Sequence, residues 1–353
     1  MKYYICEGST AEGKYNATSK ARADAENILN RNGYKPYSIH TTNCVKKNKL
    51  LKILQFFGYI KNYIIWKKEI KKIPNYSIVV IQYPIIYTAL FFKSILKKLN
   101  KMNITTIALI HDLDSIRLKE TDGLRFKRAK YEDMELPREF SYVISHNEKM
   151  TQKLLEFGVK KNKIINLNLF DYLSDVKIEI NKRGKDKPII IAGNLSTEKA
   201  GFLKELNKIK KIKFNLYGKG LDIELNKNIN YKGSFLPDEL SENLEGSFGL
   251  VWDGTSIYKI NGTYGNYMKY NNPHKISLYI SSELPVIVSS ESALAPFVTK
   301  NKIGITVKSL KELENVIPKI TEKEYNEMLN NIKKISIKIK IGDYLTEAIN
   351  KIK

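Results

Sequence analysis

The sequence predicts an α/β protein of two domains, each built on a parallel sheet. Short apolar runs of strand length, such as residues 77–82 (SIVVIQ) and 104–110 (ITTIALI), alternate with longer stretches of helical periodicity. This alternation pauses in a charged, weakly periodic stretch at residues 171–187 and then restarts. The length of 353 residues also suits two average domains. Strands that alternate with helices in both halves predict two doubly wound sheets.

In the first half, apolar runs bounded by turn residues predict strands at residues 2–6, 37–40, 77–82, 104–110, 142–145 and 163–167. Helical apolar spacing predicts helices at residues 17–32, 50–72, 85–99 and 147–157. Gly33 and Gly158 follow two of these helices, where glycine can adopt the left-handed conformation that closes a helix. We expect residues 1–170 to form one domain and residues 171–187 to form a linker.

The second half repeats the pattern. Its predicted strands are residues 189–192, 213–217, 230–232, 248–252, 285–288 and 304–307. Its predicted helices are residues 197–209, 237–244, 274–280, 291–298, 309–317 and 322–353, the last with a break near Gly342-Asp343. A long loop is expected at residues 253–270. We assign residues 188–320 to a second domain and residues 321–353 to C-terminal helices.

The chain is strongly basic, with 60 Lys and Arg against 37 Asp and Glu and a net charge of +23. The lysines are spread over the whole length, which favours a solvated surface or loose attraction to an anionic membrane face over specific nucleic-acid binding. The two cysteines, Cys6 and Cys44, are too few for a disulfide framework. The N-terminus lacks the apolar core of a signal peptide, and the most apolar region is too polar to span a membrane. We therefore expect a cytoplasmic protein, with the inner face of the membrane as an alternative location.

The stretch at residues 271–288 (NNPHKISLYISSELPVIV) organises the functional prediction. It opens with a polar turn, and Pro273 then starts a predicted helix that carries Lys275 in its first turn. The free N–H groups of a helix start and a lysine charge together form a good anion site. The alternative is that Lys275 is one more surface lysine in a lysine-rich chain.

In the first half, His111-Asp112 directly follows a buried strand, and Asp114 and Arg117 lie in the same loop. A histidine at such a strand end can act as a general base, with a nearby carboxylate to orient it. The alternative is a structural histidine beside an aspartate that caps the loop. His146 is expected to be the neighbour of a helix N-cap.

Residues that follow strands in the second half are candidates for ligand binding, because ligands of doubly wound sheets bind at the carboxyl ends of strands. The turn at residues 217–220 is equally compatible with a hairpin, and residues 193–196 with a helix N-cap that binds no ligand. The candidates are Gly193, Asn194, Tyr217, Gly218, Lys219, Phe235, Leu236 and Asp253.

Several common site types are disfavoured by the sequence. There is no GxGxxG, no GxxxxGK[ST] and no GxSxG. The histidines and cysteines lack the spacing of metal ligands, and Asp112-Leu113-Asp114 resembles a metal-binding DxD motif only weakly. We expect neither a metal nor a cofactor.

Together these motifs resemble those of a family of bacterial sugar transferases. The family includes the glucosyltransferase that acts second on serine-rich repeat adhesins, and galactofuranosyltransferases of polysaccharide synthesis. The resemblance covers nearly the full length, and its most specific motif is Tyr270-Asn271-Asn272-Pro273-His274-Lys275. Its other motifs are His111-Asp112 with Asp114 and Arg117, Gly193-Asn194-Leu195, Tyr217-Gly218-Lys219-Gly220, Gly233-Ser234-Phe235, Pro237-Asp238-Glu239-Leu240 and Gly249-Leu250-Val251-Trp252-Asp253-Gly254.

The resemblance implies a GT-B fold, in which two Rossmann-like domains flank the active site. The N-terminal domain would bind the acceptor, the C-terminal domain would bind the nucleotide-sugar, and the C-terminal helices would pack back toward the N-terminal domain. It implies that Lys275 neutralises the diphosphate of UDP, helped by the helix start at Asn272 and Pro273, and that Asn271 bonds to phosphate or sugar. His274, beside Lys275, is also counted among the binding residues. The resemblance also implies that Asp253 lies beside the donor sugar, and that a loop around Asn16 and Thr18 closes over the donor. His111 or Asp112 would activate the acceptor hydroxyl, with Arg117 nearby. The implied uridine and ribose pocket is formed by Gly193, Asn194, Tyr217, Gly218, Lys219, Phe235 and Leu236.

The implied activity is transfer of a hexose, in the first instance glucose, from a UDP-sugar to N-acetylglucosamine on a serine-rich adhesin. Alternatives are a galactofuranosyltransferase of capsule synthesis and a non-catalytic GT-B scaffold partner. Retaining and inverting stereochemistry both stay open. The expected partners are the UDP-sugar, a glycan or glycoprotein acceptor and further copies of the chain, with no nucleic acid.

Overall fold

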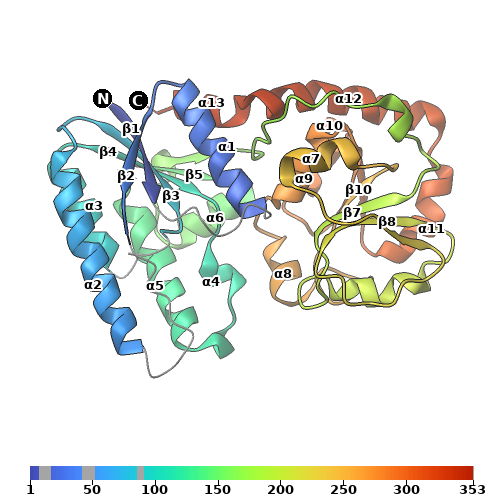
Figure 1. The fold of residues 1–353 in the computed structure, drawn as a ribbon, viewed down its shortest axis with the longest axis horizontal. Coiled ribbons are helices and arrows are strands. Elements are labelled where there is room, and N and C mark those ends of the chain that lie inside the picture. Colours follow the sequence, from blue (N-terminus) through green and yellow to red (C-terminus); the bar gives the residue numbers. More distant parts are fainter. Residues whose placement is uncertain (8–16, 42–51, 86–90, 353) are drawn as a thin grey trace. The chain divides into compact units, whose positions relative to one another are not determined.

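The computed structural model describes residues 1–7, 17–41, 52–85 and 91–352, with the backbone alone described at residues 17–19, 52–54 and 180. The described residues form two compact units. Unit 1 holds those within residues 1–13, 25–167 and 346–353, and unit 2 holds those within residues 14–24 and 168–345. Each unit contains a twisted parallel sheet with helices against it, which confirms the predicted fold class (Figure 1). The domain boundaries expected from the sequence stay predictions.

The sheet of unit 1 has six parallel strands in the order β2-β1-β3-β4-β5-β6. The strands are β1 (Lys2–Glu7), β2 (Lys35–Ile39), β3 (Ile78–Tyr83), β4 (Thr105–Ile110), β5 (Tyr142–Ser145) and β6 (Ile164–Asn166). The central strands β3 and β4 are apolar and almost wholly buried, as expected of a sheet covered on both faces. Every strand predicted in the first half is present. The strand order reverses between β1 and β3, and such a reversal marks the ligand-binding edge of a doubly wound sheet.

The helices of unit 1 differ from the prediction in three places, one of which is the short helix α4 in a stretch expected to be a loop. Helix α3 starts later than expected, and residues 86–90 lie outside the described part. Helix α5 was not predicted, because its charged residues and Pro137 obscure the apolar spacing that buries Ala129 and Leu136. The helices are α1 (Ala17–Arg31), whose first half belongs to unit 2, α2 (Lys52–Glu69), α3 (Phe92–Lys101), α4 (Asp114–Arg117), α5 (Leu124–Glu139) and α6 (Glu148–Glu156).

The sheet of unit 2 also has six parallel strands, in the order β12-β11-β10-β7-β8-β9. The strands are β7 (Ile189–Asn194), β8 (Phe214–Lys219), β9 (Ile229–Tyr231), β10 (Gly249–Val251), β11 (Val286–Ser289) and β12 (Gly304–Val307). Each corresponds to a predicted strand. The order reverses between β7 and β10, which makes the ends of these two strands the switch point of the sheet.

The connections of unit 2 contain three corrections to the prediction. Residues 201–208 form a 3₁₀-helix, Gly201–Lys208, where an α-helix was expected, and the expected loop at residues 253–270 contains a short helix, α8 (Gly262–Tyr267). Helix α10 starts at Ala295 because Ser292 and Leu294 form a turn before it. The helices are α7 (Pro237–Asn243), α8, α9 (His274–Ser281), α10 (Ala295–Asn301), α11 (Leu313–Val316), α12 (Glu322–Ile341) and α13 (Asp343–Asn350), most of which belongs to unit 1.

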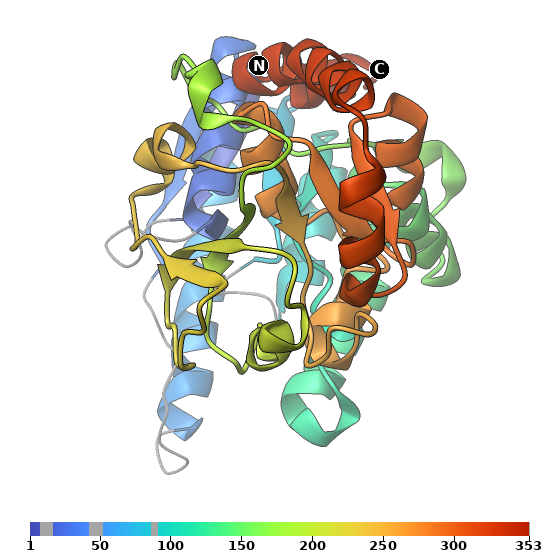
Figure 2. The same cartoon turned by 90° about the vertical axis from the view of Figure 1, so that its right-hand side faces the viewer.

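A continuous apolar core holds unit 2 together. Its largest fully buried side chains include Trp252, Phe248 and Tyr279, which come from β10, its flanks and α9. Helix α12, red in Figure 2, packs on this core and starts with a complete capping box at Thr321. Gly342 ends α12 in the left-handed conformation, at the break expected from the sequence. Among the described residues, no helix combines the length and the apolar character needed to cross a membrane.

Candidate functional site

Lys275 lies in the first turn of α9, and Pro273 is the N-cap of this helix. The Nζ atom of Lys275 donates to Asp253 Oδ1 at 2.8 Å and to the carbonyl oxygen of Trp252 at 3.2 Å. Only 16% of the lysine side chain and 8% of the aspartate side chain are exposed. Burial lowers the pKa of Lys275, and the nearby Asp253 opposes that change while Lys199 adds to it. Lys275 is therefore a buried cation at a helix N-terminus, and it is not an ordinary surface lysine.

This ion pair lies at the switch point of the unit 2 sheet. Trp252 and Asp253 directly follow β10, and Gly193 and Asn194 end the neighbouring strand β7. Strands on the two sides of a switch point lead to loops that diverge, which leaves a crevice for a ligand. The fold thus places a buried cation and a helix start where a doubly wound sheet binds its ligand.

Gly193 and Gly218 face each other at the paired ends of β7 and β8, where a side chain on Gly218 would not fit. A Cβ atom on Gly218 would lie 1.8 Å from the carbonyl oxygen of Gly193, and Gly218 has a φ of +144°. Asn194 Oδ1 accepts from the N–H of Ser196 and so fixes the turn that follows β7. Lys219 continues the ladder between these strands, with its carbonyl oxygen accepting from the N–H of Leu195 at 2.8 Å. The predicted Gly193 and Gly218 motifs therefore lie side by side at this edge of the sheet.

Asn271 precedes α9 and is notable for its side-chain oxygen, Oδ1. Its Oδ1 atom is buried and makes no hydrogen bond to any described residue. A buried polar atom without a partner costs about 1–3 kcal/mol, so proteins rarely keep one without a reason. An incoming hydroxyl or amide group could satisfy this oxygen.

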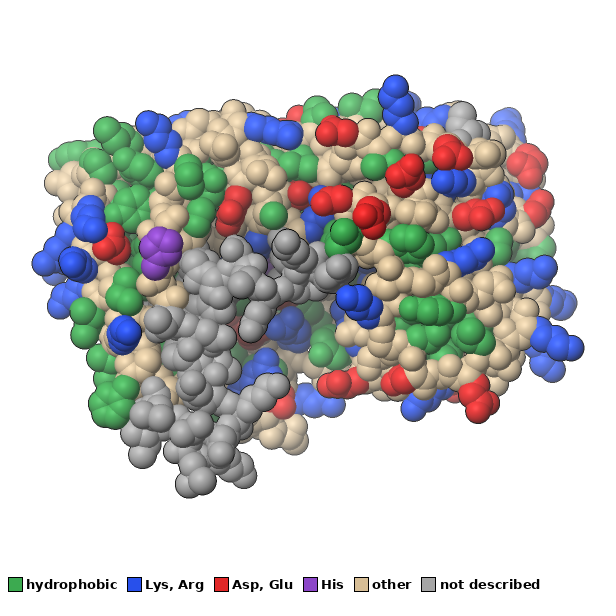
Figure 3. All heavy atoms as spheres, in the orientation of Figure 1, with side chains coloured by type: hydrophobic (Ala, Val, Ile, Leu, Met, Phe, Trp, Pro, Cys, Tyr) green, Lys and Arg blue, Asp and Glu red, His purple; other side chains and the backbone are tan. Residues whose placement is uncertain are grey.

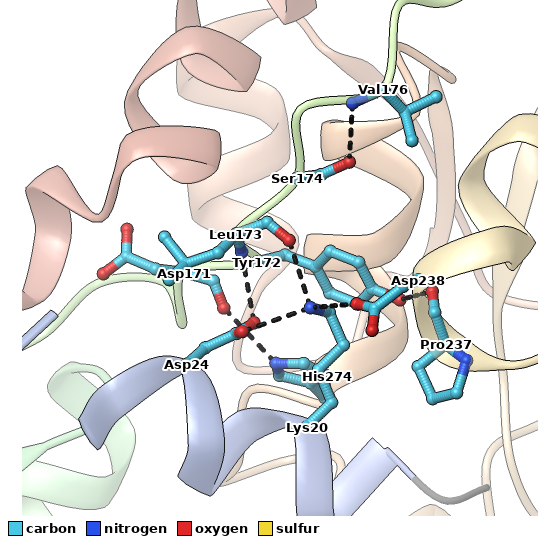
Figure 4. A network of polar contacts seen from close by, with 10 residues as sticks. All are labelled: Lys20, Asp24, Asp171, Tyr172, Leu173, Ser174, Val176, Pro237, Asp238 and His274. Atoms are coloured by element: carbon cyan, nitrogen blue, oxygen red, sulfur yellow. Dashed lines mark hydrogen bonds and ion pairs between the residues drawn. The ribbon is translucent and has the colours of Figure 1, made fainter. Parts of the chain in front are cut away.

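His274, the neighbour of Lys275, belongs to a separate polar network within unit 2 (Figure 4). Its Nε2 atom lies 3.3 Å from the carbonyl oxygen of Asp171, and its ring centroid lies 5.2 Å from that of Tyr172. Burial lowers the pKa of His274 to about 4, so this imidazole is neutral at pH 7. Adjacent helical residues point about 100° apart, which explains why Lys275 and His274 reach different surroundings.

The same network fixes the start of α1. Lys20 Nζ donates to Asp24 at 3.1 Å, to Asp238 at 2.8 Å and to the carbonyl oxygen of Leu173 at 3.0 Å. The ring of Tyr172 lies below this ammonium, at 4.6 Å from its centroid. Figure 4 shows these groups converging on Lys20. The network anchors α1, α7 and the segment before β7 to one another around His274.

The predicted nucleoside pocket contains side chains with a structural role. Tyr217 is buried, and its hydroxyl oxygen accepts from the N–H of Glu245 at 3.1 Å. Its ring packs on Phe235, with centroids 6.2 Å apart. Leu236 is the N-cap residue of α7. The tyrosine side chain therefore packs in the core of unit 2.

In unit 1, His111 is buried after β4 and is oriented by a glutamine. Its Nε2 atom lies 2.7 Å from Gln82 Oε1, and Gln82 Nε2 donates to Glu26 Oε1 at 3.1 Å. Because the Glu26 carboxylate can only accept, the amide nitrogen of Gln82 faces it and the amide oxygen faces His111. His111 Nε2 therefore donates to Gln82 Oε1. The sequence analysis missed Gln82 and Glu26.

The carboxylates that follow His111 pair with an arginine. Arg117 donates to Asp112 Oδ2 at 3.4 Å and to Asp114 Oδ1 at 2.6 Å. A carboxylate linked to His111 is that of Glu26, which reaches it through Gln82. His146 is buried with Nε2 3.0 Å from the carbonyl oxygen of Ile110, and burial lowers its pKa to about 4. Its neighbour Asn147 caps α6, as expected from the sequence.

Two predicted site residues fall at the edge of the described structure. Asn16 lies outside the described residues, and Thr18 lies in α1 with its side chain outside them. Within the described ranges, no three His, Cys, Asp or Glu side chains come together as metal ligands would. The expected independence from metal stays a prediction.

Comparison with known proteins is consistent with this architecture. The model of the glucosyltransferase 3-like N-terminal domain matches residues 2–169, and that of the glucosyltransferase 3-like C-terminal domain matches residues 189–352. The chain is 34% identical to the beta-1,6-galactofuranosyltransferase WbbI of Escherichia coli over 79% of each protein. It is 24% identical to glucosyltransferase 3 of Streptococcus parasanguinis, over 77% of this chain and 78% of that protein. In structure it is similar to HepE of Anabaena, solved in complex with UDP, with a TM-score of 0.55, 13% identity and coverage of 100% of both chains.

Proposed function

The chain belongs to the glucosyltransferase 3-like family of glycosyltransferases, and from this premise we propose that it transfers a hexose from a UDP-sugar to a glycan acceptor. The buried Lys275 at the N-terminus of α9 carries this proposal. Departure of UDP would place negative charge on the diphosphate, and a fixed cation at a helix start would stabilise that charge without a metal. Asp253 holds the lysine in place before the diphosphate arrives.

The surroundings of Lys275 support a nucleotide-sugar as the ligand. Gly193 and Gly218, paired at the ends of β7 and β8, carry no side chain that would keep a nucleoside and its phosphates away from the backbone. The unpartnered Oδ1 of Asn271 would accept a hydrogen bond from a donor-sugar hydroxyl. HepE, a protein of similar fold, binds UDP. We assign Asp253 to the donor-sugar side of this site and Pro273, the N-cap of α9, to the diphosphate side.

In unit 1, His111 is the proposed group that activates the acceptor hydroxyl. Gln82 and Glu26 orient its ring through Nε2, and we propose that the imidazole takes the proton of the attacking hydroxyl. Asp112 and Arg117 would bind the acceptor beside it. For Asn16 and Thr18 we propose the role that the family resemblance implies, in a loop that closes over the donor.

Glucose and galactofuranose are the two alternatives for the transferred sugar. The family models are named for glucosyltransferase 3, which favours glucose as the transferred sugar. With glucose, the family resemblance implies N-acetylglucosamine on a serine-rich adhesin as the acceptor. The higher identity to WbbI, 34% against 24% for a glucosyltransferase 3, favours galactofuranose, for which the resemblance implies an acceptor of capsule synthesis. A non-catalytic scaffold is disfavoured by the intact Lys275 and His111.

A transfer assay separates these functions. UDP-glucose, UDP-galactopyranose and UDP-galactofuranose would each be offered with an N-acetylglucosaminyl peptide and with a free glycan, and products would be detected by mass spectrometry. Both hexoses add the same mass, so the donor that was supplied identifies the sugar. Product from one donor, absent in Lys275→Ala, is the expected result. If no donor supports transfer while UDP still binds, the scaffold function is favoured.

We further propose that the protein acts in the cytoplasm at the inner membrane face and self-associates. The net charge of +23 supports attraction to anionic lipid. Figure 3 shows Lys and Arg side chains scattered over one face, with Asp and Glu between them. Such a distribution supports loose surface attraction rather than a nucleic-acid groove. Sedimentation with anionic and zwitterionic vesicles tests the first point, and light scattering after size exclusion tests the second.

A further inference from the structure

The hydroxyl group of Tyr279 lies inside the hydrogen-bond ladder between the two central strands of unit 2. Tyr279 comes from α9 and is completely buried. Its oxygen accepts from the N–H of Ala192 in β7 at 2.8 Å and donates to the carbonyl oxygen of Leu250 in β10 at 3.3 Å. A helix side chain thus bridges two strands that are neighbours in the sheet order.

The register of the sheet shows which rung this hydroxyl replaces. Gly249 pairs with Ile190, and the N–H of Ile190 donates to the carbonyl oxygen of Phe248 at 2.8 Å. In a parallel ladder the next bond on that side would join the N–H of Ala192 to the carbonyl of Leu250. Tyr279 occupies that step, so its hydroxyl holds the strands apart there by the width of one oxygen atom.

Gly249 makes room for this arrangement. A Cβ atom at Gly249 would lie 2.2 Å from Cγ of Tyr279, so any other residue would displace the ring. Gly249 and Tyr279 therefore form a matched pair. The tyrosine ring lies over the strand at the only residue type that accommodates it.

Beyond Leu250, a side-chain hydrogen bond from α9 takes the place of backbone pairing with β7. Lys275 precedes Tyr279 by four residues and so shares its face of the helix. Its Nζ atom bonds to the carbonyl oxygen of Trp252, two residues beyond Leu250. Strand β7 meanwhile stays paired with β8 as far as Asn194 and Lys219. The sheet therefore opens between β7 and β10, where the proposed donor site lies.

We propose that Tyr279 is a positioning residue for donor binding, which keeps the ends of β7 and β10 apart at the distance that a nucleoside diphosphate requires. It acts through the strands and does not contact the donor. This inference rests on the proposed function, because it presumes that a nucleoside diphosphate binds beside Lys275. The strand separation sets the distance from the Gly193 turn on one side to Asp253 and Lys275 on the other.

The test compares Tyr279→Phe with Tyr325→Phe. Tyr325 is a matched control, because it is also buried in unit 2 and its hydroxyl donates to the carbonyl oxygen of Ser247, just before β10. That contact lies at the opposite end of the strand from the proposed site. Binding of UDP to each variant would be measured by calorimetry well below both melting temperatures, alongside KM for the donor and kcat.

Both variants lose one buried hydroxyl and should be destabilised to similar extents. Only Tyr279→Phe should weaken UDP binding, by about tenfold, and raise the donor KM in proportion while kcat changes less. Equal UDP affinity in the two variants would overturn the inference. If the wild-type protein binds no UDP, the proposed function fails first, which is a distinguishable result.

Hydrogen exchange in the wild-type protein gives a second measurement that needs no variant. UDP should slow exchange in peptides that cover residues 189–195 and 249–254, because the ligand fixes both sides of the opened ladder. Slowing confined to one of the two strands would contradict a site that spans them.

Discussion

The pairing of Lys275 with Asp253 is the residue-scale feature on which the proposed chemistry depends. A buried ion pair is weak support for stability, because desolvation offsets much of the attraction between the charges. Its value here is orientation, since the aspartate keeps the ammonium at the switch point of the sheet. The ammonium group of Lys275 is therefore in position before a diphosphate binds.

Replacing Lys275 by alanine should lower kcat by roughly 100-fold, because stabilisation of the leaving group is lost. The buried Asp253 would lose its partner, so the free energy of unfolding should also fall, by about 3 kcal/mol. Lys302→Ala is the control, since Lys302 is exposed and pairs with Glu327 on the surface. Steady-state kinetics of both variants check this, and near wild-type turnover in Lys275→Ala would exclude the lysine from the chemistry.

Replacing Gln82 by leucine should lower kcat about tenfold without raising the donor KM, because His111 loses the group that orients its ring. The pH profile of kcat should also shift, since Glu26 is no longer linked to the imidazole. Asn100→Leu serves as a control, because Asn100 is an exposed amide of the same unit that bonds to the carbonyl oxygen of Glu139. Unchanged kcat and pH profile in Gln82→Leu would remove His111 as the base.

Local sequence could reveal some of these residues and not others. Lys275 was predictable, because Pro273 marks the helix start beside it. Gln82 and Glu26 reach His111 from distant parts of the chain, so no local spacing reveals them. Tyr279 has the appearance of an ordinary core aromatic in the sequence, and only the strand register shows the position of its hydroxyl.

At the scale of elements, the paired ends of β7 and β8 depend on glycine. The absence of a side chain at Gly218 lets its backbone, with a φ of +144°, lie beside Gly193 where a Cβ atom would not fit. This approach shapes the edge of the sheet that faces the proposed donor site.

Gly218→Ala should weaken UDP binding and lower the melting temperature, because its Cβ atom would lie 1.8 Å from the carbonyl oxygen of Gly193. Gly233→Ala is the matched control. Gly233 also has a positive φ, of +93°, yet a Cβ atom there would meet nothing within 4 Å. Thermal melting and calorimetry with UDP distinguish the steric clash of the added Cβ atom from the destabilisation that alanine causes at any position with a positive φ. Equal losses of UDP affinity and of melting temperature in the two variants would contradict this role of Gly218.

Apolar periodicity identified the strands of both sheets, since buried parallel strands are nearly continuous apolar runs. It could not identify α5, whose charged outer face and Pro137 break the pattern. It also gave an α-helix at residues 197–209, where the described structure has a 3₁₀-helix at Gly201–Lys208. The difference between these two helix types depends on tertiary packing, to which Gly201 contributes by lying against Thr255.

At the scale of the whole molecule, buried titratable groups should make stability depend on pH. Burial raises the pKa of Asp133 to about 7, although Tyr83 and Ser115 donate hydrogen bonds to it. Because the folded protein then holds this proton more tightly than the unfolded chain, the contribution of Asp133 is present below about pH 4 and is lost as the pH rises to about 7. The buried histidines His146 and His274 act in the opposite direction between about pH 4 and 6.5.

Asp133→Asn isolates one of these contributions. The unfolding free energy of the variant relative to wild type should rise between pH 4 and pH 8, by on the order of 2 kcal/mol or more. Any hydrogen bond lost on substitution shifts the difference equally at every pH. Chemical denaturation across this range measures the difference, and a constant offset would show that Asp133 titrates normally in the folded protein.

The family resemblance extends over both units, and its most specific motif lies at the start of α9. The sequence could therefore predict the fold class and the general activity. It could not choose between glucose and galactofuranose, because loops determine acceptor and donor preference and vary independently of the scaffold.

Thermal melting of wild type and Lys275→Ala, each with UDP, ADP and GDP, tests the central claim most directly. A ligand at a hundred times its dissociation constant stabilises a protein by about 2.7 kcal/mol, a readily measured shift. We predict a shift with UDP alone in the wild type and a much smaller one in Lys275→Ala. No shift with any nucleotide, or equal UDP shifts in both proteins, would contradict a donor site at the start of α9.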